Sequence, residues 1–361
     1  MINGHGGNIY ETAQRLGCEP SDIIDMSSNV NPLGPPPGLT DFLKEKMNVI
    51  TALPQAGAEK AISAFARRYN VSPNLVLSGN GTTQLIHTVP QALGTRKACI
   101  LAPTYSDYGD ACAMHHVPCE YLIAEASSDF KHDMGQIQKK TEGADTVFIC
   151  NPNNPTGVLI PADELRWLCS TYPNKYFIID ESYLPFVHEA DHYTMLNCGL
   201  PNVVVLNSMS KIFRVPGLRI GFLVSSEKII KKFMRYALPW SVNSLAQAAV
   251  IYMMEKQAET DMFVQKTRIF LETQRKQIGK AFENASEIKF FPSVTSFMLA
   301  RLSENFMADE ICAQLSQERI LIRNCENFKG LSNRFIRISL KTQEINSRLT
   351  EKLATALVSV P

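Results

Sequence analysis

Short apolar runs recur along the first two thirds of the chain, and each is followed by a polar turn and a stretch with helical spacing of apolar residues. The runs cover residues 75–77, 98–101, 146–150, 176–179, 203–206 and 220–224. Runs this short and this apolar are typical of strands buried on both faces, as in a parallel sheet covered by helices. The pattern predicts an α/β protein with a mostly parallel central sheet.

The last third of the chain has a different pattern. A long, charged helical stretch from about 245 to 285 precedes four apolar runs at 288–291, 296–300, 320–323 and 335–339, and a final helical stretch covers 343–357. This succession favours a smaller α+β domain. The proline-rich segment 31–38 cannot be helical and reads as an extended connector. We therefore expect an amino-terminal arm at 1–34 that joins the small domain, a large domain at 35–250 and a small domain at 251–361.

Composition narrows the possible partners. The chain has 361 residues, of which 45% are hydrophobic, enough for about two domains with a substantial core. The 36 basic and 35 acidic residues nearly cancel, which argues against nucleic acid or a membrane surface as the main partner. No apolar stretch reaches the ~18 residues of a membrane span, and no export signal is visible. The nine cysteines form no CxxC pair, so we expect reduced thiols, no metal site and a cytoplasmic protein acting on small molecules.

One polar turn carries the clearest chemistry. Lys211 follows the apolar run 203–206, with Ser208 and Ser210 beside it and Arg219 eight residues later. Burial at a strand end disfavours the ammonium and leaves a nucleophilic amine, while hydroxyls and a guanidinium suit a phosphate dianion. A lysine that reacts with an aldehyde beside a phosphate site is what pyridoxal 5'-phosphate requires. The alternative is an ordinary exposed lysine in a serine-rich loop.

Two further strand-end turns fit the same cofactor. Gly81 and Thr82 stand between a strand and a helical stretch, where backbone amides could bind phosphate, although a plain capped turn would look the same. Asp180 ends an apolar run, and a buried carboxylate needs a cationic partner, which could be a protonated pyridine nitrogen or an arginine.

Aromatic and amide side chains complete the set. Tyr105 could stack on a flat cofactor, Tyr183 could hydrogen-bond a ring oxygen, and Asn154 lies between two prolines with its amide free to donate. The ordinary alternatives are that the two tyrosines are core or cleft aromatics and that Asn154 is a turn residue whose side chain hydrogen-bonds its own backbone. Since ligands of open α/β sheets gather at the carboxyl ends of strands, we expect these turns to converge on one site.

The segments 151–157 (NPNNPTG), 180–183 (DESY) and 208–211 (SMSK), with Arg219, resemble the cofactor motifs of fold-type I pyridoxal-phosphate enzymes of the class I/II aminotransferase family. The resemblance covers nearly the whole chain and implies the PLP-dependent transferase fold, with a seven-stranded type of sheet, and a homodimer. It also implies that Lys211 bonds to the cofactor aldehyde and that Asp180 keeps the ring nitrogen protonated. Tyr183, the third residue of this catalytic set, would contact the phenolic oxygen of the ring. The remaining cofactor contacts that it implies are Asn154, Tyr105, Gly81, Thr82, Ser208, Ser210 and Arg219.

The amino-terminal arm distinguishes branches of that family. Residues 4–8 (GHGGN) together with 25–34 (DMSSNVNPLG) resemble the opening of L-threonine O-3-phosphate decarboxylases of cobalamin biosynthesis. Histidinol-phosphate aminotransferases share the NPLG portion at 31–34 and usually lack residues like 4–8. The resemblance implies decarboxylation of L-threonine O-3-phosphate to (R)-1-amino-2-propanol phosphate. We expect the substrate to contact His5, Asn31, Asn154, Arg323 and Arg337.

Several alternatives stay open at this point. The arm could be a disordered tail, the reaction could be a histidinol-phosphate type of transamination, and the substrate could be L-serine O-phosphate. A non-catalytic binding protein with the same fold is a further possibility. The chain also departs from the family at Leu53, where many members carry a tyrosine that reaches the cofactor phosphate of the neighbouring subunit. Leu53 removes that expected contact.

Overall fold

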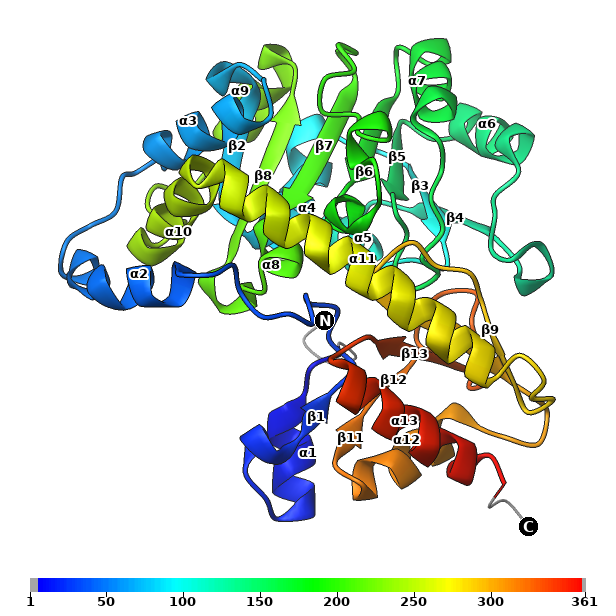
Figure 1. Ribbon diagram of the computed structural model, residues 1–361. Coiled ribbons are helices and arrows are strands. Elements are labelled where there is room, and N and C mark those ends of the chain that lie inside the picture. Colours follow the sequence, from blue (N-terminus) through cyan, green and yellow to red (C-terminus); the bar gives the residue numbers. More distant parts are fainter. Residues whose placement is uncertain (1–5, 359–361) are drawn as a thin grey trace.

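The central sheet has seven strands. The computed structural model describes residues 6–358 (Figure 1). Strand β8 is antiparallel to both of its neighbours, and all other pairs are parallel, so the mostly parallel sheet is confirmed. The spatial order is β2 (Val76–Asn80), β8 (Ile220–Ser225), β7 (Val203–Ser208), β6 (Tyr176–Asp180), β5 (Thr146–Cys150), β3 (Ala98–Ala102) and β4 (Cys119–Ile123).

Helices cover both faces of this sheet, as the apolar strands require. Alternate strand residues such as Phe148 and Ile178 pack with α4 (Gly81–Leu93), α5 (Asp107–Met114) and α9 (Glu227–Met234). Residues of the opposite parity, such as Val147 and Ile179, pack with α6 (Met134–Glu142) and α7 (Ala162–Thr171). The edge strand β4 was not predicted because only Leu122 of its residues is buried, so it lacks an apolar run.

The helical stretch predicted from about 245 to 285 is two helices. Helix α10 (Ser244–Glu255) ends before Lys256, and α11 (Gln257–Ala281) begins after it and crosses the molecule toward the second sheet (Figure 1). Helix α10 packs on α3 (Glu59–Arg68) and α2 (Leu39–Glu45). The predicted domain boundary at residue 250 therefore falls inside α10.

The second sheet is smaller and antiparallel. Its order is β12 (Arg323–Asn324), β13 (Phe335–Ser339), β10 (Phe297–Leu302) and β9 (Ile288–Phe290). Apolar residues of α12 (Ala308–Gln317) and α13 (Gln343–Ala356) share a core with its strands. In the amino-terminal arm, α1 (Ile9–Leu16) precedes β1 (Ile24–Asp25), which pairs in parallel with β11 (Ile320–Leu321). The arm is thereby held against the carboxy-terminal part of the chain.

Between residues 6 and 358, no helix combines the length and the apolar composition needed to cross a membrane.

Candidate active site

Two adjoining cavities lie at the carboxyl ends of β5, β6 and β7. The first, of about 80 Å³, is lined by all ten residues that the sequence assigned to cofactor binding. The second, of about 180 Å³, shares Tyr105, Asn154, Tyr183 and Lys211 with the first and extends toward the amino-terminal arm and the second sheet. We call them the sheet-end cavity and the arm cavity. The predicted convergence of the strand-end turns is confirmed.

Lys211 lies on the short helix α8 (Met209–Ile212), directly after β7. Burial lowers the pKa of its ammonium to about 8, and the positive charges of Arg337 and Arg219 act in the same direction. A larger share of neutral amine is therefore present near neutral pH than an exposed lysine would have. Lys211 lines both cavities. Its amine could therefore reach a ligand bound in either of them.

Asp180 ends β6 and is 4% exposed. Its Oδ1 accepts from the Ser182 amide at 2.9 Å, and its Oδ2 accepts from the Tyr108 hydroxyl at 2.8 Å. Burial raises the pKa of Asp180, and Lys211 is the cation that opposes this. Within residues 6–358 no arginine forms a salt bridge with it, so the carboxylate lines the cavity with no cation bonded to it.

Tyr108 escaped the sequence analysis. It is buried, stacks on Phe148 with ring centroids 5.5 Å apart, and meets Tyr105 edge to face at 5.8 Å. The available signal was its position three residues after Tyr105, next to the start of α5. Tyr108 lines the sheet-end cavity and holds the carboxylate of Asp180, a contact that the sequence alone does not show.

The other end of the sheet-end cavity is lined by groups that favour a dianion. The amino terminus of α4 contributes Gly81 and Thr82, and Ser208 and Ser210 contribute hydroxyls beside Arg219. Gly81 has φ +70°, and a Cβ at this position would lie 2.6 Å from Nη2 of Arg219. Glycine is needed here both for the backbone conformation and for the close approach of the guanidinium. Amides at a helix start, hydroxyls and a fixed guanidinium together favour phosphate.

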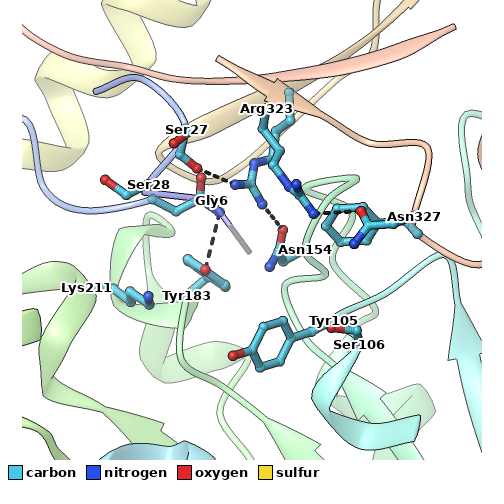
Figure 2. A pocket seen from close by; sticks show the side chains of 13 residues that line it. Gly6, Ser27, Ser28, Tyr105, Ser106, Asn154, Tyr183, Lys211, Arg323 and Asn327 are labelled. Atoms are coloured by element: carbon cyan, nitrogen blue, oxygen red, sulfur yellow. Dashed lines mark hydrogen bonds between the residues drawn. The ribbon is translucent and has the colours of Figure 1, made fainter. Parts of the chain in front are cut away.

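Tyr183 and Asn154 stand where the two cavities meet (Figure 2). The Tyr183 hydroxyl accepts from Nδ2 of Asn29 at 3.2 Å, and burial raises the pKa of Tyr183 to about 12. Tyr105 lines both cavities, and burial raises the pKa of its hydroxyl as well. These phenols stay protonated at neutral pH and can donate to a bound oxygen.

The arm cavity contains two guanidinium groups from adjacent strands. Arg323 on β12 lies opposite Arg337 on β13 in the antiparallel register. Arg337 is 4% exposed and donates to the Ser27 carbonyl at 2.6 Å and to Oδ1 of Asn154. Arg323 donates to Oδ1 of Asn327 at 2.6 Å. None of these three acceptors is a carboxylate, although Asp25 acts electrostatically on Arg337. Two guanidinium groups in one cavity suit anionic ligand groups.

The arm itself forms one wall of this cavity. Gly6, Ser27, Ser28 and Asn29 line it, and the Gly7 amide donates to Oγ of Ser27 at 2.6 Å. His5 lies outside the described residues, so its expected contact stays a prediction. Ser27, Ser28 and Asn29 belong to the segment 25–34 that resembles the decarboxylase opening, but the sequence alone did not identify them as site residues.

The expectation for Asn31 as a substrate contact is wrong in this structure. Asn31 is fully buried and lines neither cavity; its Nδ2 donates to the Ile212 carbonyl at 2.8 Å and to Oγ1 of Thr267 at 2.9 Å. Its Oδ1 accepts from the Leu33 amide at 2.9 Å. The amide is thus fully used in holding the arm connector against α8 and α11. Asn29, two residues earlier, faces the cavity instead.

The surroundings match pyridoxal 5'-phosphate by their chemistry. The carboxylate of Asp180 has no bonded cation and would gain one from a protonated ring nitrogen; Lys211 offers an amine, and the Gly81 turn with Arg219 offers a phosphate cradle. A flat ring between them would meet Tyr105 and Tyr183. Leu53, by contrast, is 76% exposed and lines neither cavity.

Comparison with known proteins agrees with this geometry. The family model described as aminotransferase class I and II matches residues 21–353. A threonine-phosphate decarboxylase of Salmonella typhimurium is 31% identical over 363 residues, which cover 99% of this chain and 98% of that protein. The adenosylcobalamin biosynthesis bifunctional protein CobDQ of Leptospira interrogans is 30% identical over 96% of this chain, and the match spans only 40% of that longer protein.

Two further proteins similar to this chain have different activities. A histidinol-phosphate aminotransferase of Methanocaldococcus jannaschii is 26% identical, with 94% of this chain and 90% of that protein covered. The crystal structure of L-threonine-O-3-phosphate decarboxylase from Porphyromonas gingivalis superposes with a TM-score of 0.82 at 28% identity, covering 93% of this chain and 100% of that one. Decarboxylases and aminotransferases are therefore both among the proteins that this chain is similar to.

Proposed function

Because this chain belongs to the aminotransferase class I and II family, whose cofactor is pyridoxal 5'-phosphate, we propose that it decarboxylates L-threonine O-3-phosphate to (R)-1-amino-2-propanol phosphate and CO2. The observation that carries this proposal is the arm cavity. It combines two guanidinium groups, Arg323 and Arg337, with a wall made by the amino-terminal arm at Gly6. A substrate with both a carboxylate and a phosphate needs two such cationic partners.

We propose the following roles for the residues that line the two cavities. Bound pyridoxal 5'-phosphate supplies an electron sink for the bond that breaks at the substrate Cα. Lys211 holds the cofactor aldehyde, and Asp180 keeps a proton at the ring nitrogen. Asn154 and Tyr183 donate to the ring oxygen, and Tyr105 covers the ring face. The residues proposed to bind the cofactor phosphate are Gly81, Thr82, Ser208, Ser210 and Arg219.

The substrate is oriented by its anionic groups. Only the Cα bond perpendicular to the cofactor ring is weakened, so a decarboxylase must hold the carboxylate in that direction. Arg337 is fixed between Ser27 and Asn154, and Arg323 is fixed by Asn327, so both guanidinium groups are preorganised. Binding energy at groups remote from Cα can then select the bond that breaks. Lys211 lies beside both cavities and is the group proposed to return a proton to Cα.

Transamination of histidinol phosphate is the second candidate, and the similarity to the Methanocaldococcus protein is the observation that favours it. L-serine O-phosphate is an alternative substrate for the decarboxylase. It lacks one methyl group, which an apolar pocket discriminates by only about 1–3 kcal/mol.

A homodimer is also proposed. Leu53, Leu238 and Trp240 are 76%, 66% and 49% exposed. The Trp240 amide donates to the Ala56 carbonyl at 3.0 Å, so the segments that carry these apolar side chains lie side by side. A second copy covering this surface would remove it from water. Sedimentation velocity tests this, and a monomer at micromolar concentration would reject it.

The reaction is tested with purified enzyme loaded with cofactor. L-threonine O-3-phosphate is supplied with and without 2-oxoglutarate, and CO2 and the amine product are measured. Amine and CO2 without any keto acid support the decarboxylase, whereas strict dependence on the keto acid rejects it. Histidinol phosphate with 2-oxoglutarate and L-serine O-phosphate alone are run in parallel, and their kcat/KM values rank the candidates. Lys211→Ala is the control that should abolish both turnover and the absorbance of covalently bound cofactor.

A further inference from the structure

Residues 25–29 of the amino-terminal arm, which we call the arm turn, include two serines that line the arm cavity, Ser27 and Ser28 (Figure 2). The side chain of Asp25 holds this turn together. Its Oδ1 accepts from the Ser27 amide at 2.9 Å, the Ser27 hydroxyl at 2.7 Å and the Ser28 amide at 3.1 Å. Its Oδ2 accepts from the Ser28 hydroxyl. The amides and hydroxyls of both serines therefore all donate to one carboxylate.

The carbonyl groups of the same two serines accept from cationic side chains. Nη2 of Arg337, on β13, donates to the Ser27 carbonyl at 2.6 Å. Nζ of Lys341, two residues after the end of β13, donates to the Ser28 carbonyl at 3.3 Å. The amides of the arm turn are thus bonded to an anion and its carbonyls to cations, so its backbone is held at both kinds of polar group.

The Asp25 carboxylate carries its charge although it is partly buried. Burial raises its pKa, but the hydrogen bonds from Ser28 and Ser27 and the charge of Lys341 outweigh this, so the pKa lies below its ordinary value. The negative charge in turn favours the charged forms of Arg337 and Lys341. Within residues 6–358 the carboxylate forms no salt bridge with either cation, and its bonds go to the serines instead.

Arg337 links the arm turn to the substrate side of the site. Its guanidinium donates to the Ser27 carbonyl and to Oδ1 of Asn154, and neither acceptor is charged. Phe297 supports the guanidinium, with Cζ of Arg337 5.3 Å from the ring centroid, but this ring offers no acceptor. The direction of the guanidinium therefore depends on where its two acceptors lie. Asp25 sets the position of one of them.

We propose that Asp25 is a positioning residue. By holding the two serines of the arm turn, it places the Ser27 carbonyl that orients the Arg337 guanidinium toward an anionic group of the substrate. Asp25 itself lines neither the arm cavity nor the sheet-end cavity, so it acts through the arm turn. This inference rests on the proposed function, in which Arg337 binds the substrate.

Asp25→Ala removes all four contacts to the serines. We expect kcat/KM for L-threonine O-3-phosphate to fall by about 10- to 100-fold, because the bond between the substrate anion and a fixed guanidinium is weakened. The dissociation constant of pyridoxal 5'-phosphate should not change, because Asp25 does not line the sheet-end cavity. Asp25→Asn keeps the shape and an oxygen for three of the four bonds, so it should restore most of the lost kcat/KM.

Asp22→Ala is the matched control. Asp22 is another acid of the arm, ion-pairs with Arg319 at 3.6 Å and lines neither cavity, so its loss should leave kcat/KM unchanged. Thermal unfolding shows whether each variant is folded. Should Asp25→Ala fail to fold, Asp25→Glu replaces it. This variant keeps the charge but displaces the carboxylate from the serines, and it should show the same loss.

A double-mutant cycle shows whether Asp25 acts through Arg337. Arg337→Leu removes the guanidinium, so adding Asp25→Ala to it should cost little more, whereas residues with separate roles lose activity additively. Where turnover is too slow, the dissociation constant of L-threonine O-3-phosphate replaces kcat/KM. It is measured from the absorbance of the bound cofactor.

Four results would overturn this inference. They are an unchanged kcat/KM in Asp25→Ala, an equal loss in Asp25→Asn, an equal loss in Asp22→Ala, and additive losses in the cycle. A natural enzyme that does not decarboxylate L-threonine O-3-phosphate rejects the proposed function instead. The same variants are then compared with histidinol phosphate and 2-oxoglutarate, because Arg337 lines the arm cavity in either case.

Discussion

Tyr108→Phe removes one buried oxygen and tests how Asp180 is held. The Tyr108 hydroxyl donates to Oδ2 of Asp180 at 2.8 Å, and the ring is kept in place by stacking on Phe148 at 5.5 Å. Phenylalanine therefore preserves the packing and removes the donor. The carboxylate would keep the Ser182 amide at 2.9 Å as a partner, and loss of the hydroxyl would raise the pKa of Asp180 further.

The size of the effect follows from the hydrogen bond. A bond to a charged group contributes about 1.5–3 kcal/mol. If Asp180 binds the ring nitrogen as an anion, losing that stabilisation should weaken cofactor binding by about 10- to 100-fold. The dissociation constant of pyridoxal 5'-phosphate is measured by titrating the apoenzyme and following tryptophan fluorescence.

A matched substitution shows whether any lost hydroxyl would have the same effect. The Tyr176 hydroxyl accepts from Nζ of Lys232 at 2.8 Å, and Tyr176 begins β6 whereas Asp180 ends it. Tyr176→Phe should leave cofactor binding unchanged. Equal cofactor affinity of Tyr108→Phe and the natural enzyme would refute the reasoning, as would an equally large loss in Tyr176→Phe.

Three other predictions concern the cofactor and the core. The rate of covalent cofactor capture by the apoenzyme should rise with pH with a midpoint near 8, because only the neutral Lys211 amine attacks; Arg337→Leu should move the midpoint upward, and stopped-flow absorbance measures both. Gly81→Ala should strain a turn at φ +70° by about 1–2 kcal/mol and displace Arg219, so that the cofactor dissociation constant rises about tenfold; an unchanged constant would show that the turn can relax. Phe222→Ala should lower the free energy of unfolding by about 3–5 kcal/mol in urea denaturation, since this side chain is fully buried; a loss below 1 kcal/mol would contradict that packing.

Elements with a strong local signal were predictable. The runs at 146–150 and 203–206 are fully buried strands, as their unbroken apolar sequence indicated. Two features with a weak local signal were not predicted. Strand β4 was missed because its residues are only partly buried, and the break at Lys256 was missed because the helical spacing continues through it.

The residues of the candidate site also differ in how far the sequence could predict them. Residues at or just beyond the end of a strand, such as Asp180 and Lys211, were placed at the sheet-end cavity because the carboxyl ends of neighbouring strands lie together. Asn31 was assigned wrongly, because sequence does not show that its amide is used by Ile212 and Thr267. Tyr108 was missed for a similar reason, since its partner Asp180 is 72 residues away.

The sequence by itself determined the apolar strands of the central sheet, because their signal is local, and its strand-end motifs indicated the cofactor through their resemblance to a known family. Only the tertiary structure decided which face each side chain serves. Asp180 and Glu181 are adjacent in the chain, yet Asp180 lines the sheet-end cavity, whereas Glu181 does not and accepts from the Thr194 hydroxyl and the Met195 amide. The pairing of β12 with β13 likewise brings Arg323 opposite Arg337. Contacts between residues distant in sequence depend on how the elements pack, and packing is a property of the whole fold.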